Sequence, residues 1–198
     1  MTNPTLLIVI VVIAIAIITV VGIVALRRQR TQKLRGHFGP EYDRAVQDTG
    51  DRARAETELE RRRKRVEGLT IRPLTREDRT RFTEGWTRVQ ARFVDDPKGA
   101  VTEADQLLGE VMSRRGYPVG DFEQRADDIS VNHPNVVDNY RKGHAIALRH
   151  ARGEASTEDL RQAMIHYRAL FADLVGSREM TTAREAEYPA EKERKIIG

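Results

Sequence analysis

The pattern of apolar and polar positions divides the chain into one long apolar run and a series of amphipathic segments. From Leu6 to Leu26 there is no charged residue, and Ile, Val, Leu and Ala dominate the run. A helix rises 1.5 Å per residue, so about 21 residues cross a hydrocarbon core that is roughly 30 Å thick. The run therefore predicts a transmembrane helix at residues 6–26, preceded by a short segment at residues 1–5.

The basic residues after this run predict its orientation. A cleaved signal peptide would have basic residues before its apolar core, but the start MTNPT contains none. The positive-inside rule therefore places the N-terminus outside and the rest of the chain inside. The same basic residues are candidate lipid contacts, at about 1 kcal/mol each near an anionic surface, although a role in topology alone is the simpler alternative. They are Arg27, Arg28, Arg30, Lys33 and Arg35.

A Gly-Pro pair follows at positions 39 and 40. Proline suits the first position of a helix, where its missing N–H costs nothing, and acidic residues behind it favour the positive end of the helix dipole. The pair therefore predicts a bend between two helices. We favour an elbow that sets an angle over a docking site for a partner. The candidate hinge or interaction residues are Phe38, Gly39, Pro40, Glu41 and Tyr42.

Residues 51–68 predict a second charged helix, within a basic juxtamembrane linker at 27–73. Glutamates precede basic residues at i,i+4 spacing, which stabilises a helix. Leu59 and Val66 lie one heptad apart, a coiled-coil spacing over too short a stretch to establish one. The basic run at 61–65 is best explained as a solvated helix face. Contact with lipid headgroups or nucleic acid through it is the alternative, and of these two partners nucleic acid is the less expected.

Amphipathic helices without strand-like alternation fill residues 74–175, which predicts a small antiparallel helical bundle and an all-α protein. Thr75, Asp96 and Ser156 are expected helix caps, and Pro134 is expected to open a further helix. An aromatic stripe of Phe82, Trp86 and Phe93 is more typical of a core than of an exposed partner groove. The polar tail at 176–198 is expected to be poorly ordered.

Composition and motifs argue against several chemistries. The 198 residues include no cysteine, which excludes disulfides and thiolate metal sites, and their 34 basic and 30 acidic residues give only a mild positive charge. The five histidines form no HExxH motif, and His144 and His166 fit packed positions better than metal sites. P-loop, GxGxxG and GxSxG motifs are also missing. We therefore predict no catalytic, cofactor or metal residues and no enzymatic activity.

Several separated segments resemble a family of uncharacterised bacterial single-pass membrane proteins with an FGPEYDR-type motif after the span. They are HFGPEYDRAV at 37–46, the stretch from Trp86 to Asp105, and RGYPVGDFEQRADDISVNHP at 115–134. The resemblance implies a location in the bacterial inner membrane and a helical cytoplasmic body. It implies no activity and no site residues.

Three functions remain open at this point. The first is a membrane-anchored module for protein–protein interaction or scaffolding, with a protein partner or self-association. The second is binding of anionic lipid or nucleic acid through the basic juxtamembrane segment, which salt would weaken. The third is an enzyme with an unrecognised site, which would show a pocket beside His144 or His166.

Overall fold

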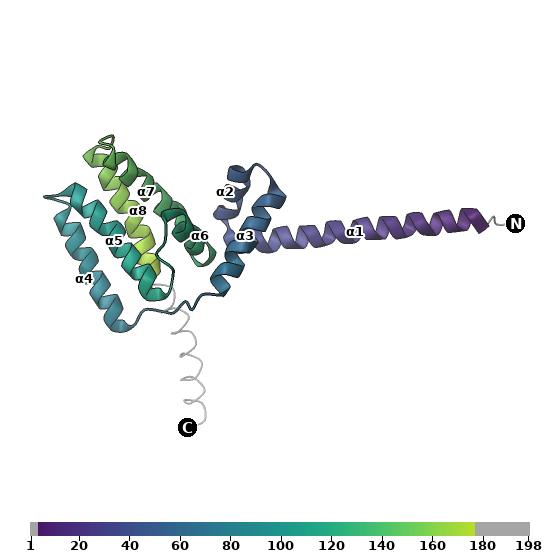
Figure 1. Cartoon of the computed structure of the whole chain (residues 1–198), viewed down its shortest axis with the longest axis horizontal. Helices are drawn as coiled ribbons and strands as arrows, with labels where there is room; N and C mark the ends of the chain where they lie inside the picture. The colour runs from purple at the N-terminus through teal and green to yellow at the C-terminus, as the bar shows by residue number, and fades with distance from the viewer. Residues whose placement is uncertain (1–3, 177–198) are drawn as a thin grey trace, which may run out of the picture. The chain divides into compact units, whose positions relative to one another are not determined.

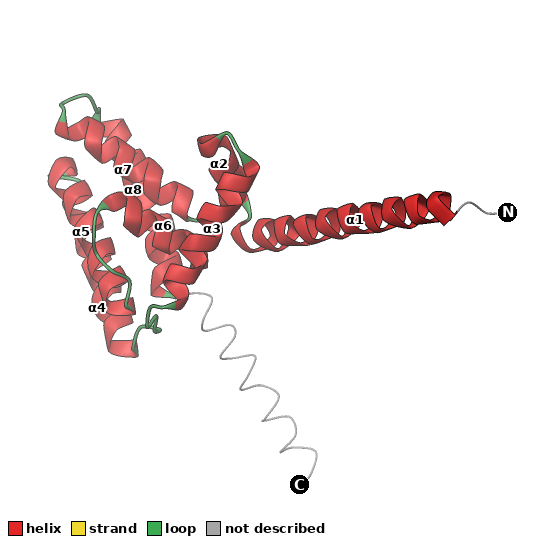
Figure 2. Ribbon diagram, turned by 45° about the vertical axis from the view of Figure 1, so that its right-hand side comes forward, coloured by secondary structure: helices red, strands yellow, loops and turns green. Residues whose placement is uncertain are grey.

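The computed structural model describes the backbone of residues 4–176 and the side chains of residues 13–15 and 17–176. Within this range the protein is all-α, as predicted (Figures 1 and 2). The eight described helices are α1 (Pro4–Phe38), α2 (Pro40–Thr49), α3 (Arg52–Glu67), α4 (Arg76–Arg92), α5 (Pro97–Arg115), α6 (Phe122–Asn132), α7 (Val137–Ala151) and α8 (Thr157–Val175).

The predicted transmembrane helix at 6–26 lies within α1. Among the residues whose side chains are described, no helix combines the length and the apolar character that a membrane span needs. The side chains of residues 6–12 and 16, which belong to the predicted span, are not among those described. The span therefore stays a prediction. The predicted tail also lies outside the described residues from position 177 onward.

Contacts divide the chain into two compact units, with the boundary between Glu60 and Arg61, inside α3. In the first unit α2 and the start of α3 lie beside the C-terminal part of α1 (Figure 1). Gly39 makes the bend between α1 and α2 with φ 50° and ψ −124°, a conformation that favours glycine, and Pro40 occupies the first turn of α2. The buried apolar side chains of this unit are Leu34, Phe38, Tyr42, Ala45, Ala55 and Leu59.

The second unit is a helical bundle. α4 packs on α5, α5 on α8, and α7 on α8, with the short α6 against α7 (Figure 2). Phe82 and Trp86 are 1% and 5% exposed in its core, whereas Phe93 is partly buried at the edge. The first two positions of the aromatic stripe therefore belong to the core.

Three predicted helix caps are confirmed. The Thr75 hydroxyl accepts a hydrogen bond from the Asp78 N–H, and the Asp96 carboxylate accepts one from the Gly99 N–H. Ser156 forms a full capping box, because the Asp159 carboxylate also accepts from the Ser156 N–H at 2.8 Å.

The expected start of a helix at Pro134 is wrong. α7 begins at Val137, because the N–H groups of Val136 and Val137 both donate to the His133 carbonyl and close a turn ahead of the helix. The proline therefore lies in the connecting turn.

The last turn of α5 joins three parts of the second unit. The Arg72 N–H of the connector between α3 and α4 donates to the Arg115 carbonyl at 2.9 Å. Arg114 pairs with Asp78 of α4 at 2.8 Å, and the buried Arg115 guanidinium donates to the Leu174 carbonyl of α8. Gly116 ends the helix at φ 97°, and a Cβ there would lie 2.3 Å from the Thr70 carbonyl oxygen. Only glycine lets the connector pass this closely.

Candidate functional site

A cationic groove lies in the first unit between α1 and the start of α3. Its volume is about 680 Å³. Positions 24, 27, 28 and 31 of α1 share one helix face because they are three and four residues apart. We call this the arginine groove, and its defining residues are Val24, Arg27, Arg28, Arg30, Arg52 and Glu56.

The one acidic residue of the arginine groove is committed to internal hydrogen bonds. Glu56 is only 8% exposed, and its Oε1 accepts from the Thr31 hydroxyl at 2.6 Å and from the Tyr42 hydroxyl at 2.9 Å. These bonds connect α1, α2 and α3. Burial, with the neighbouring Glu56 carboxylate second, raises the pKa of Tyr42, so its phenol stays a donor. Glu56 therefore holds the fold of this unit, and the arginines dominate the groove's charge.

The four arginines of the groove make no ion pair within the described part of the chain. Unpaired guanidinium groups converging on a hollow are suited to an anion, especially a phosphate or carboxylate that accepts paired N–H bonds. Val24 adds an apolar wall at the end nearest the apolar run. The groove can therefore hold an anionic head beside an apolar chain.

The structure brings together only part of the predicted lipid-contact set. Arg27, Arg28 and Arg30 line the arginine groove, but Lys33 does not. Arg35 instead pairs with Asp43 of α2 at 3.0 Å, across the bend. Arg52 joins the groove from α3, and sequence analysis missed it because its approach to α1 depends on two chain reversals.

The elbow residues are mostly inside the first unit. Phe38, Tyr42 and Glu41 are 0%, 3% and 3% exposed, so neither aromatic ring is presented to a partner from this unit. This arrangement favours the elbow over the docking site. Whether the bend acts as a hinge stays a prediction.

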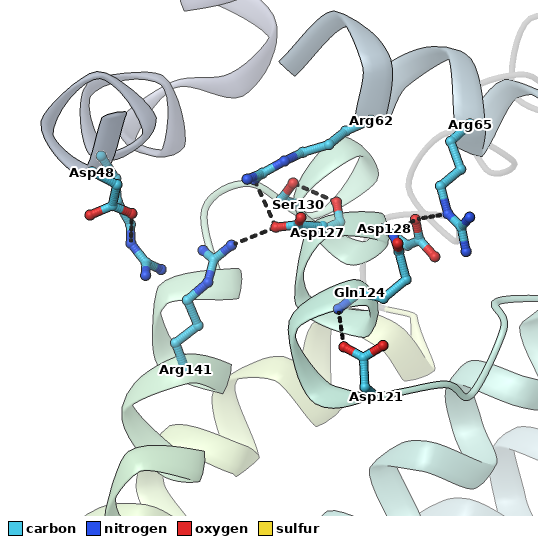
Figure 3. Close-up of polar contacts among 10 residues, drawn as sticks. Asp48, Arg62, Arg65, Asp121, Gln124, Asp127, Asp128, Ser130 and Arg141 are labelled. Carbon is cyan, nitrogen blue, oxygen red and sulfur yellow. Dashed lines mark hydrogen bonds and ion pairs between the residues drawn. The ribbon is translucent and has the colours of Figure 1, made fainter. Parts of the chain in front are cut away.

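A second charged cluster connects α3 to α6 and α7 within the second unit (Figure 3). Arg62 pairs with Asp127 at 2.9 Å, and Arg141 approaches the same carboxylate at 3.4 Å. Arg65 pairs at 2.8 Å with Asp128, whose side chain is fully buried. The basic run at 61–65 is thus not simply a solvated face, because two of its arginines pair with Asp127 and Asp128 of α6.

The histidines that sequence analysis singled out are packed. His144 stacks on Phe122 with ring centroids 3.6 Å apart, and burial lowers its pKa. The His166 Nδ1 lies 2.9 Å from the Asn139 side-chain oxygen, and burial, with Lys142 second, lowers its pKa as well. Both imidazoles are therefore more readily neutral than free histidine. No cluster of potential metal ligands occurs among the described residues.

An open groove of about 700 Å³ lies between α4 and α8 in the second unit. Trp86 and Phe171 line it, stacked with ring centroids 4.7 Å apart and an interplanar angle of 19°. Arginines and threonines surround this pair. We call it the aromatic groove, defined by Trp86 and Phe171 together with Arg76, Arg79, Thr83 and Arg168.

Comparison with known proteins found no match: no family model, curated protein or solved structure resembles the chain significantly. The resemblance to a bacterial membrane-protein family therefore stays a prediction.

Proposed function

We propose that the protein is a membrane-anchored helical protein whose arginine groove binds the phosphate heads of anionic lipids. Residues 6–26 would span the bacterial inner membrane, with the N-terminus outside and the helical body in the cytoplasm. The observation that carries the proposal is the convergence of Arg27, Arg28, Arg30 and Arg52 on one groove that begins where the apolar run ends.

The position and chemistry of the groove support this ligand class. Val24 lies inside the uncharged run and also lines the groove, so acyl chains would be adjacent to the arginines. Each arginine near an anionic surface contributes about 1 kcal/mol, which is roughly a fivefold change in affinity. Such binding would fix both the depth of the first unit in the membrane and its rotation about the axis of α1.

Native mass spectrometry of the full chain tests the proposal. The chain is released from vesicles containing equal amounts of an anionic and a zwitterionic phospholipid, and the retained lipids are counted. We expect preferential retention of the anionic lipid, and a roughly fivefold loss of that preference in Arg52→Ala. Arg54→Ala is the matched control, because Arg54 is an exposed arginine of α3 that does not line the groove.

Equal retention of both lipids, or equal losses in Arg52→Ala and Arg54→Ala, would contradict headgroup binding. The anchor is tested separately by alkaline extraction. The full chain should stay with the membrane fraction, and a chain lacking residues 6–26 should not. If the full chain were extracted, the proposed membrane anchor would be wrong. Anion binding by the arginine groove would then be tested by titrating the chain with a soluble phosphate.

The second candidate function is protein–protein interaction or scaffolding, including self-association, through the second unit. The aromatic groove favours it, because exposed arginines and threonines border an open hollow in which only the edges of the largely buried Trp86 and Phe171 are reachable. A photo-crosslinker at Thr83, inside the groove, should give discrete adducts in cells. The same crosslinker at Thr102, exposed on α5 outside the groove, should not. Identical adduct patterns at both positions would speak against this candidate.

A further inference from the structure

We propose that the aromatic groove is the docking site of an acidic segment of the same chain, residues 185–191, which occupies it in the absence of a partner. The sequence of this segment is EAEYPAE, with three glutamates and one tyrosine. The inference concerns regulation of the second candidate function and does not depend on lipid binding.

Charge complementarity selects this occupant. The arginines at the edge of the groove are Arg76, Arg79 and Arg168, against the single acid Glu84. Arg76 and Arg168 make no ion pair within the described part of the chain. Residues 192–198 are basic and apolar (KERKIIG), so the acidic segment is the part of the following chain that suits a cationic rim.

The floor of the groove suits the tyrosine of the segment. Trp86 and Phe171 are 5% and 6% exposed, so the edges of the stacked rings form an apolar floor that a tyrosine ring can contact. The buried indole N–H of Trp86 has no acceptor in the described part of the chain, and a buried indole usually has one. This N–H is covered by neighbouring atoms, so an acceptor from the docked segment would reach it only if the indole turned toward the groove.

Chain geometry makes docking in cis feasible. Gly176 itself lines the groove and ends α8 with φ 104°, a left-handed conformation that turns the chain out of the helix direction. The groove extends along α8 from Arg168 to Gly176, about 12 Å at 1.5 Å per residue. Tyr188 follows Gly176 by twelve residues, which reach up to about 40 Å when extended. Pro189 favours extended backbone at Tyr188, as a groove-bound segment requires.

Because it is tethered to the groove, this segment is favoured over a separate acidic ligand of similar affinity. A short flexible linker gives a tethered segment an effective concentration on the order of millimolar. A weakly binding segment therefore fills the groove in most molecules, and a partner has to displace it.

Fluorescence of Trp86, the only tryptophan of the chain, reports directly on the groove. Acrylamide quenching of the detergent-solubilised full chain is compared with that of a chain ending at Gly176. We expect the truncated chain and Tyr188→Ala to be quenched more strongly. Ile197→Ala is the matched control, because it removes an apolar side chain from the same tail outside the acidic segment, and it should behave like the full chain.

A labelled peptide of residues 183–193 gives the second measurement. It should bind the truncated chain, and the full chain should need on the order of tenfold more peptide, because the tethered copy competes. Arg168→Glu in the truncated chain should weaken peptide binding. Arg161→Glu should not, since Arg161 lies outside the groove and pairs with Glu158 of its own helix.

Three results would overturn the proposal. One is unchanged quenching of Trp86 after truncation, and another is equal peptide affinity for the full and truncated chains. The third is protection of Trp86 that increases with protein concentration, which would assign the groove to the segment of a second copy. The absence of crosslinked adducts at Thr83 would count only against the interaction function. Quenching and peptide binding are measured on the purified chain, so they test the docking of the acidic segment separately.

Discussion

The contact between Gly143 and Tyr167 gives the most quantitative prediction. Gly143 lies in the middle of α7, and a Cβ added there would lie 2.6 Å and 2.7 Å from two ring carbons of Tyr167 on α8. Tyr167 is fully buried, so its ring has no free space into which it can move. Gly143→Ala therefore adds a methyl group where the bundle is already filled.

Two opposing effects set the magnitude. Alanine in a helix interior is more favourable than glycine by about 0.8–1.0 kcal/mol, whereas overpacking a core costs about 1–3 kcal/mol. We expect Gly143→Ala to lower the free energy of unfolding by about 1–2 kcal/mol, because the clash is with the body of a rigid ring. Urea denaturation followed by helical circular dichroism measures this change.

Gly109→Ala is the matched control. Gly109 lies within α5, and a Cβ there would meet only side-chain atoms of Arg125 and Val119, at 3.6 Å and 3.7 Å. Helix propensity should then dominate, and the free energy of unfolding should rise by up to about 1 kcal/mol. If Gly143→Ala proved as stable as Gly109→Ala, the α7–α8 packing described above would be wrong.

Three further changes test other contacts. Asp128→Asn removes the buried carboxylate that pairs with α3, so hydrogen exchange at residues 61–67 should rise and stability should fall by about 1–3 kcal/mol; unchanged protection would contradict the pairing. Ser156→Ala should cost about 1 kcal/mol of stability by removing a helix cap. Hydrogen bonds from Ser156 first, then Arg149, lower the pKa of Asp159 from 3.8 to about 2, so this carboxylate stabilises the fold above about pH 4 and loses that effect as pH falls toward 2. The variant should therefore show a smaller loss of stability in that window, and an identical acid profile would be inconsistent with this cause. Replacing Gly39–Pro40 with two alanines should straighten the first unit, and an unchanged spin-label distance between α1 and α2 would refute the elbow.

Local features of the fold were predictable from sequence, and non-local contacts were not. The caps at Thr75 and Ser156 follow from residue types three positions apart, which only neighbouring backbone atoms can satisfy. Pro134 is compatible both with the start of a helix and with a turn. The turn forms because the His133 carbonyl accepts hydrogen bonds from the N–H groups of Val136 and Val137. Sequence spacing alone gives no indication that Arg52 approaches the arginines of α1.

The aspartate pair illustrates the same limit. Asp127 and Asp128 look like exposed acids on a polar helix face when only their neighbours are considered. Their partners Arg62 and Arg65 lie more than sixty residues earlier, and only the folded chain brings them together. The pairing explains why a run of five basic residues need not bind an external anion.

The connection of the last turn of α5 to the preceding connector has a mechanical consequence. A pull on the chain from its N-terminal side would first load the ion pairs between α3 and α6. It would next load the Arg72–Arg115 hydrogen bond, before any tension reached α4. Both attachments lie on helices later in the chain, so α4 is shielded from force. In a single-molecule pulling experiment the second half of α3 should detach as a separate early step, while the bundle behind it stays folded.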